Sequence, residues 1–501
     1  MRGCFASVNT PFGALYRLTL GIASPRIAES APRAPGEECL IVPVERFSLD
    51  PYIDPERWPH LAELPRGRFL GKRSEAFRER LEKLLDDEGV SFDSKDETYL
   101  EVRDGFMLDR VVAQGWLGLA ESYLIGEWRA EPLVKVLEVL LRQPLEAPMN
   151  TLLGGISPRK PRHDFGSVRA GELPDGLVEL YAGATRATAT ALFASAARTT
   201  ETVQVDRRTG EILVDDEEKP APRGVAGVAA GVRRRLSRPV EPVRLDETWY
   251  LEPADVQRQD LNSGQLRRIN LMLDEANVGP GDRVLELSSS GGQLAILAAQ
   301  RGASVSVLTS DEEHAEVVRS RVHQAGVAGG VRVEPISGPV PSPRQWAGEY
   351  DAIFSTERLE TLGAGGLGHF FRAVDRLLAD GGVAVVQTLV ATPQMRDTAR
   401  ESLDVVRGYI WPALEYSPAA LIRQHIFTAG LDVVAENHLG PHLAATLPMW
   451  RAHFASRERQ AAAAGFDAIY RRLWDFQLAL HEALVDAGDI DCMQFVIRHR
   501  R

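Results

Sequence analysis

Acidic and hydroxyl residues stand at the ends of several short apolar runs in the second half of the chain. Glu286 and Thr309 close the first two of these runs, and Glu360 lies just past the fourth. If the runs are parallel strands, their carboxyl ends meet at one edge of a sheet, which is where ligands of such sheets bind. We therefore expect Glu286, Thr309 and Glu360 to lie around one binding site.

The stretch Pro280–Leu294, PGDRVLELSSSGGQL, has the pattern of a strand, a small-residue turn and a helix. Such a turn brings backbone N–H groups close to a nucleoside ligand, and in the usual Asp/Glu-x-Gly-x-Gly-x-Gly form its glycines allow positive φ. Here the three glycine positions hold Ser288, Ser290 and Gly292. A serine forced to positive φ costs on the order of 1–3 kcal/mol. We therefore expect the turn to bind its ligand more weakly than the usual form does.

Five apolar runs, most of them separated by helical patterns, must position these residues. A helix is predicted to begin near Gln293, directly after the turn. Strands that alternate with helices of about a dozen residues predict a doubly wound, mostly parallel sheet with helices on both faces. The predicted fold is therefore an α/β, Rossmann-like domain with helical elaborations, preceded by a smaller α+β domain. The predicted strands are Arg283–Leu287, Val305–Leu308, Val331–Glu334, Ala352–Phe354 and Val383–Thr388.

The composition is that of a globular chain. Its 501 residues are 44% hydrophobic, and the formal net charge of −12 disfavours binding of nucleic acid by the surface as a whole. No apolar run reaches the roughly 18 residues that span a bilayer. Cys4, Cys39 and Cys492 are too few and too scattered for a disulfide framework, which favours a reducing cytoplasm. We expect no bound metal, because four histidines lack the spacing of a metal site: His314, His369, His438 and His442.

Shifts in composition divide the chain into four parts. The first 28 residues contain no Asp or Glu, and Arg17 interrupts their only apolar run, so a loose or membrane-touching extension is favoured over a secretory leader. An acidic run, Asp215–Glu218, and a basic run, Arg233–Arg238, are typical of a linker. The predicted parts are an N-terminal extension (1–57), a domain with long helical patterns (58–200), an acidic then basic linker (201–244) and the sheet-containing domain (245–501).

Several segments together resemble the cyclopropane fatty acid synthases and the related mycolic and tuberculostearic acid methyltransferases, which use S-adenosylmethionine to alkylate double bonds of lipid acyl chains. The resemblance covers roughly Leu81–Arg142 and Gln265–Arg498, in the long two-domain form of the family. It implies a class I methyltransferase fold, with S-adenosylmethionine near Glu286, Ser288, Ser290, Gly292, Thr309 and Ser310. The segments are GWLGLAESYLIGEW, PGDRVLEL, YDAIFSTERLETLG, VDRLLADGG, GYIWP and the C-terminal FDAIYRRLWDFQLALHEALVDAGDIDCMQFVIRHR.

The chain departs from this family at the residues that hold bicarbonate, the base that takes a proton from the methylated chain. The family's cysteine, glutamate, histidine and tyrosine are matched only by Glu360, because the histidine position reads Gln387 and the tyrosine position Leu443. The residue after the glutamate is Thr361 instead of histidine. A buried anion needs several convergent donors. We therefore expect no bicarbonate, and keep Glu360 and Gln387 as the candidate catalytic residues.

Three functions stay open at this point. The favoured one is a degenerate family member with reduced or lost catalysis that binds lipid or pairs with an active paralogue. The second is an active methyltransferase of unsaturated acyl chains that uses a base other than bicarbonate, and the third binds another nucleotide. The expected partners are an acyl lipid or phospholipid surface and a second subunit, in the cytoplasm or at the inner face of the membrane. Three aromatic residues are expected in the core in preference to a lipid groove: Trp116, Tyr123 and Trp128.

Overall fold

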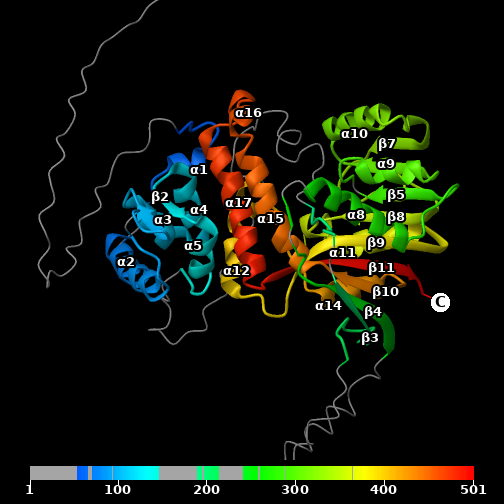
Figure 1. Ribbon diagram of the computed structural model, residues 1–501, viewed down its shortest axis with the longest axis horizontal. Coiled ribbons are helices and arrows are strands. Elements are labelled where there is room, and N and C mark those ends of the chain that lie inside the picture. The colour runs from blue at the N-terminus through cyan, green and yellow to red at the C-terminus, as the bar shows by residue number, and fades with distance from the viewer. Residues whose placement is uncertain are drawn as a thin grey trace, which may run out of the picture. The chain divides into compact units, whose positions relative to one another are not determined.

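The structure is a computed structural model (Figure 1). It describes residues 53–65, 70–92, 94–145, 189–194, 197–213, 241–254, 256–257, 260–287, 289–363 and 365–500. Most of the predicted N-terminal extension, the acidic run Asp215–Glu218 and the basic run Arg233–Arg238 lie outside these residues. Of the helices in the described ranges, none combines the length and the apolar character needed to span a membrane.

A nine-stranded sheet forms the centre of the second half, in the order β3-β4-β10-β11-β9-β8-β5-β6-β7. Neighbours from β9 to β7 run parallel, as do β4 and β10, whereas β11 is antiparallel to both β9 and β10. This arrangement confirms the predicted Rossmann-like fold and all five predicted strands. The strands are β3 (Arg198–Asp206), β4 (Pro242–Tyr250), β5 (Arg283–Leu287), β6 (Ser304–Thr309), β7 (Val331–Pro335), β8 (Tyr350–Thr356), β9 (Leu378–Ala391), β10 (Leu431–His438) and β11 (Ile490–His499).

Two apolar layers cover the faces of this sheet. Successive side chains of a strand point to opposite faces, and on β5 Val284 packs in one layer while Leu285 packs in the other. The layer that contains Val284 also contains residues of α8 (Asp260–Glu275), α9 (Gln293–Gln300) and α10 (Glu312–Gln324). The short helix η2 (Ala328–Gly330) follows α10 in the chain. The layer that contains Leu285 also contains residues of the helices α11 (Gly366–Leu377) and α14 (Ala419–Thr428). The sheet is therefore doubly wound.

The N-terminal helices share one core with helices from the end of the chain, α17 above all (Figure 1). Trp116 and Trp128 are buried in it, as predicted, and Tyr123 donates to Asp475 over 3.1 Å. The predicted boundary between a first and a second domain therefore runs through a common core. The elements are α1 (Pro59–Ala62), α2 (Leu70–Asp87), β1 (Tyr99–Val102), α3 (Phe106–Gln114), α4 (Trp116–Ile125), β2 (Trp128–Glu131), α5 (Leu133–Leu140), α12 (Asp397–Ser402), α13 (Asp404–Tyr409), α15 (Gly440–Ala455), α16 (Glu458–Ala463) and α17 (Ala468–Asp486).

The predicted linker, residues 201–244, is wrong at both of its ends. β3 and β4 pair antiparallel from Arg198 opposite Tyr250 to Asp206 opposite Pro242, and β4 joins the sheet beside β10. Composition misled here because β3 is mostly exposed, and an edge strand rich in Thr, Glu and Gln has the polarity of a linker. Residues 214–240, with both charged runs, lie outside the described residues.

Candidate active site

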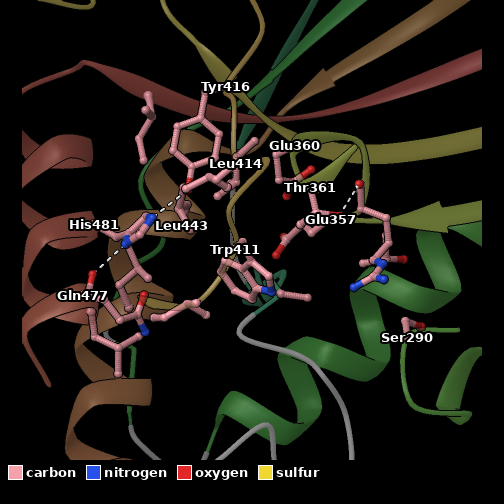
Figure 2. Close-up of a pocket in the computed structure, with 18 of the residues that line it drawn as sticks. Ser290, Glu357, Glu360, Thr361, Trp411, Leu414, Tyr416, Leu443, Gln477 and His481 are labelled. Carbon is pink, nitrogen blue, oxygen red and sulfur yellow. Dashed lines mark hydrogen bonds between the residues drawn. The ribbon is translucent and has the colours of Figure 1, made fainter. Parts of the chain in front are cut away.

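A cavity of about 460 Å³ lies beyond the carboxyl ends of β5, β8 and β9, where ligands of such sheets bind (Figure 2). One end is polar, with Ser289, Ser290, Thr356, Glu357, Arg358, Glu360 and Thr361. The rest of its wall is mainly apolar and comes from β9, β11, α15, α17 and the segment after α13, with Leu389, Ile410, Trp411, Leu414, Leu443, Leu447, Trp474, Leu478 and Ile490. The predicted cofactor turn and an apolar wall therefore line the same cavity.

In the turn after β5, positive φ falls on one expected glycine position, Gly292, and on Gly291, which was not one of the expected positions. Positive φ falls on Gly291 (101°) and Gly292 (88°), whereas Ser290 is not at positive φ. The expectation that a strained Ser290 weakens binding is therefore wrong, because the strained positions are both glycine. Ser288 lies outside the described residues.

The carboxylate of Glu286 is turned inward onto this turn. Its Oε1 accepts from the backbone N–H and from the hydroxyl of Ser290, each over 2.5 Å. Its Oε2 is buried and has no hydrogen-bond partner among the described residues. Burial raises the pKa of this carboxyl group, although the two bonds from Ser290 act in the opposite direction. Glu286 thus keeps one unpaired acceptor oxygen at the end of β5.

Four of the predicted cofactor residues do not line the cavity: Glu286, Gly292, Thr309 and Ser310. The hydroxyl of Thr309 accepts from the backbone N–H of Asp311 over 3.2 Å, Ser310 is exposed, and Gly292 packs against Val318. Ser290 is the predicted cofactor residue that does line it, together with Ser289, which was not predicted. The Ser289 hydroxyl lies 3.0 Å from Nε2 of the buried His314.

These observations fit a nucleoside cofactor bound at the turn. Two serines face the cavity, Gly291 and Gly292 allow close approach of a ligand to the backbone, and Glu286 offers a buried oxygen that lacks a donor. A ligand with N–H or O–H groups would satisfy that oxygen. S-adenosylmethionine carries both kinds of group.

Glu357 is the residue of this site that sequence reasoning missed most clearly. It has φ of 47°, an uncommon conformation for a residue other than glycine and one that clusters at functional sites. Its Oε1 accepts from the backbone N–H of Thr190 (2.8 Å), the hydroxyl of Thr190 (3.1 Å) and Nε2 of Gln387 (2.8 Å). Burial raises the pKa of Glu357, while these donors and the charge of Arg268 favour its anion.

Glu360 lies in η3 (Leu359–Thr361) and faces the same cavity (Figure 2). Its Oε2 is 2.6 Å from the hydroxyl of Thr388. Burial and the neighbouring charge of Glu357 raise the pKa of Glu360 to about 8. At neutral pH Glu360 is therefore largely neutral, and the negative charge of Glu357 is one of the causes that keep it so.

Gln387 does not reach the cavity, which corrects its prediction as a catalytic residue. It is fully buried on β9, donates to Glu357 and accepts from Nε2 of Gln494 over 2.9 Å. Its role is to position the carboxylate of Glu357. Cys492 is also buried nearby, with its Sγ 4.0 Å from the same Glu357 oxygen. With two carboxyl groups at the polar end and Leu443 on the apolar wall, the described residues do not fit bicarbonate.

A buried tyrosine and histidine face the cavity from the segment after α13 and from α17. The Tyr416 hydroxyl lies 2.6 Å from Nε2 of His481, and Nδ1 of His481 lies 2.6 Å from the backbone carbonyl of Gln477 (Figure 2). No sequence signal pointed to this pair, because 65 residues separate its members and each sits in an apolar stretch.

A second buried charged cluster lies outside the cavity, between β4 and β10. Ligand atoms of Glu247, Glu436 and His438 lie within 4.8 Å of one another, a grouping that sequence spacing could not show. However, Arg423 donates to both oxygens of Glu436 over 2.6 Å, so these oxygens are already engaged by a cation. Although burial acts in the opposite direction, Asp491 and Glu247 raise the pKa of His438 to about 9. We interpret the cluster as an ion-pair network.

Comparison with known proteins decides the family. The family model described as mycolic acid cyclopropane synthetase matches residues 244–495, half of the chain. The chain belongs to this family. Tuberculostearic acid methyltransferase of Mycobacterium tuberculosis is 27% identical to it over 469 residues, which make up 89% of this chain and 96% of that protein. Cyclopropane mycolic acid synthase 1 of the same species is 25% identical, over 50% of this chain and 90% of that one.

A solved structure of a cyclopropane synthase from Mycobacterium tuberculosis covers 49% of this chain and 87% of that chain, with 21% identity and a TM-score of 0.44. Membership of the mycolic acid cyclopropane synthetase family confirms the predicted resemblance. It assigns the chain to a family of S-adenosylmethionine-dependent lipid methyltransferases and cyclopropane synthases.

Proposed function

We propose that this member of the mycolic acid cyclopropane synthetase family is an S-adenosylmethionine-dependent methyltransferase that acts on unsaturated acyl chains of lipids without bicarbonate. The observation that carries the proposal is the single cavity that joins Ser290 of the turn to the apolar wall around Leu443, past Glu357 and Glu360. In a degenerate site we would expect side chains to fill this space. The cavity volume lies within the range of ligand sites in proteins, about 300–1,000 Å³.

The turn after β5 would hold the cofactor, which supplies an electrophilic methyl group when bound. Ser289 and the backbone of Ser290 would contact it from the wall of the cavity, and the unpaired oxygen of Glu286 would accept from one of its N–H or O–H groups. The bonds between Glu286 and Ser290 compete with this contact. We therefore expect weaker binding than a turn without that serine would give.

The carboxyl pair would act on the charge that develops in the lipid. Methylation of an alkene leaves a positive charge on the acyl chain, and a fixed negative charge in a site that excludes water stabilises such a transition state strongly. Glu357 supplies that charge, because its donors Thr190 and Gln387 favour the anion. Glu360, as a largely neutral acid, limits the net charge of the pair to about one.

A second candidate function is a lipid-binding subunit without catalysis. It is favoured by the inward-turned carboxylate of Glu286 and by the buried position of Gln387, which together leave both family sites altered. Such a subunit would bind the acyl chain along the same apolar wall and pair with an active paralogue. In either case we propose a phospholipid surface as the partner, with the protein bound peripherally at the inner face of the membrane.

Calorimetric titration of the full chain with S-adenosylmethionine and S-adenosylhomocysteine, combined with thermal shift, separates the two functions. Saturable binding at micromolar to submillimolar strength supports the methyltransferase. Absence of heat and of any thermal shift, at protein concentrations that detect millimolar binding, contradicts it and supports the lipid-binding subunit.

A further inference from the structure

The hydrogen bonds of Tyr416 and His481 fix where their protons lie. A backbone carbonyl can only accept, so the contact of 2.6 Å between Nδ1 of His481 and the carbonyl of Gln477 requires a proton on Nδ1. In the neutral ring Nε2 is then an acceptor, and the Tyr416 hydroxyl must donate to it across their 2.6 Å contact. Tyr416 is thus a hydroxyl paired with a base that a third group orients, which is the arrangement of an activated nucleophile or proton acceptor.

This pair is built into the wall of the site. Both side chains line the cavity and are at least 95% buried. The residue before Tyr416, Glu415, donates its backbone N–H to the backbone carbonyl of Glu360 over 2.8 Å, so the segment that carries the tyrosine is fastened to the loop that carries the carboxyl group. Tyr416 and Glu360 therefore keep a fixed relation across one cavity.

The charges around the pair suit a neutral proton acceptor. Burial lowers the pKa of His481, with the Gln477 carbonyl acting in the opposite direction, so its ring is neutral at physiological pH. Burial and the charges of Glu360 and Glu357 raise the pKa of Tyr416, with Arg407 opposing them, so the tyrosine keeps its proton in the resting site. Glu360 is a poor acceptor at this pH because it is already largely protonated. Glu357 has one oxygen committed to three donors.

We propose that Tyr416 is the catalytic residue that takes the proton from the methylated acyl chain, and that it passes its own hydroxyl proton to Nε2 of His481. The inference rests on the proposed function. The C–H bond beside the cationic carbon breaks, and its electron pair forms the new carbon–carbon bond or double bond. The chain loses its positive charge, Tyr416 ends neutral with the substrate proton, and His481 ends as imidazolium. His481 is the positioning partner, and its depressed basicity lets it release the proton before the next turnover.

The first test reads protons directly and needs no cofactor. The full chain with ¹⁵N-labelled histidine is titrated by NMR, and the His481 signals are identified by their loss in His481→Gln. We expect the Nδ1–H form of His481. We also expect its pKa to rise in Tyr416→Phe, because the neutral ring loses its donor, but to stay the same in Tyr350→Phe, whose hydroxyl contacts Trp346 instead. An Nε2–H form, or no change of pKa in Tyr416→Phe, overturns the proposal.

The second test follows methyl transfer from labelled S-adenosylmethionine to vesicles of dioleoyl phosphatidylglycerol. General base catalysis contributes about 10²–10⁴-fold, so Tyr416→Phe and His481→Gln should each lose on the order of 10²-fold in kcat while calorimetry shows unchanged binding of the cofactor. Gln at position 481 can accept the tyrosine hydrogen bond but not its proton. The controls Tyr350→Phe and His499→Gln should keep wild-type rates.

The pH profile separates a proton acceptor from a merely structural residue. Wild-type activity should fall as the pH drops through the pKa of His481, below about 6.5, and the acidic limb should disappear from the residual activity of His481→Gln. If the wild type is active and both variants keep their rates, the inference fails and the proposed function stands. If the wild type binds no cofactor and forms no product, the proposed function fails, and this inference with it.

Discussion

The carboxylate of Glu286 accepts both the backbone N–H and the hydroxyl of Ser290, each over 2.5 Å, while its other oxygen stays buried without a partner among the described residues. A turn with glycine at position 290 would keep only the backbone bond. The serine hydroxyl therefore competes with any ligand for the acidic residue of the turn. This competition, and not backbone strain, is the physical reason to expect altered cofactor affinity.

Ser290→Ala should tighten the binding of S-adenosylmethionine about threefold to tenfold. The substitution removes the competing hydroxyl, and a hydrogen bond of this kind contributes roughly 0.5–1.5 kcal/mol net. Calorimetric titration of the full chain measures the change, with Ser310→Ala as the matched control on the exposed turn after β6. Weaker binding by Ser290→Ala would mean that the hydroxyl itself contacts the cofactor.

Glu360→Gln should stabilise the protein at alkaline pH and have little effect near pH 5. The folded-state pKa of Glu360, about 8, lies above its ordinary value, so its favourable contribution is complete below about pH 4.5 and is lost as the pH rises through 8. Gln cannot ionise and escapes that loss. Urea denaturation should show that the free energy of unfolding of Glu360→Gln, relative to that of the wild type, is higher at pH 8.5 than at pH 5 by more than about 1 kcal/mol. Equal stabilities at both values, or the same gap in exposed Glu349→Gln, would contradict a buried neutral acid at position 360.

Leu443→Trp should abolish use of the lipid and leave cofactor binding intact. Leu443 is 1% exposed and lines the apolar wall away from the turn, so a larger side chain fills the space meant for an acyl chain. Methyl transfer to unsaturated phospholipid vesicles should fall at least tenfold, on the order of 1.4 kcal/mol or more. Leu251→Trp, at a position that is 47% exposed, is the control. Retained transfer in the Leu443 variant would place the acyl chain elsewhere.

Tyr409→Phe should weaken the contact between the N-terminal helices and the rest of the molecule. The Tyr409 hydroxyl donates to Oε1 of the fully buried Glu121 over 2.7 Å, and loss of such a bond costs about 1–3 kcal/mol. Because both sides belong to one core, we expect a single unfolding transition at a lower urea midpoint, with fluorescence and far-UV circular dichroism coincident. Two separate transitions in the wild type would show that the halves fold independently.

The five strands from β5 to β9 were predictable because they are apolar and helices separate most of them. β5, β6, β7 and β9 stand out from the segments around them by their Val and Leu, and β8 by Ile353 and Phe354. β3 and β4 did not stand out, because β3 is a polar edge strand and β4, between β3 and β10, carries polar residues among its apolar ones. β10 and β11 lie among helical patterns in the sequence. They pair with each other although they are far apart along the chain, so no local pattern indicates the pairing.

The site was predictable only where one segment carries its own signal. Ser290 and Glu360 follow strand ends, so their position at the cavity could be inferred from local pattern. Glu357 lies three residues before Glu360 in the sequence. Only the structure distinguishes it, by its positive φ and by the three hydrogen bonds that its carboxylate accepts. Tyr416 and His481 meet across 65 residues, a proximity that no spacing rule expresses.

The central claim is that one cavity holds a methyl donor beside an unsaturated acyl chain, and the most direct measurement is transfer of a methyl group between them. Purified full chain is incubated with S-adenosylmethionine deuterated in its methyl group and with vesicles of dioleoyl phosphatidylglycerol, and the lipid is analysed by mass spectrometry. The account predicts acyl chains that carry the deuterated carbon, with much less in Tyr416→Phe. Unlabelled lipid after prolonged incubation, from protein that calorimetry shows to bind the cofactor, would contradict it.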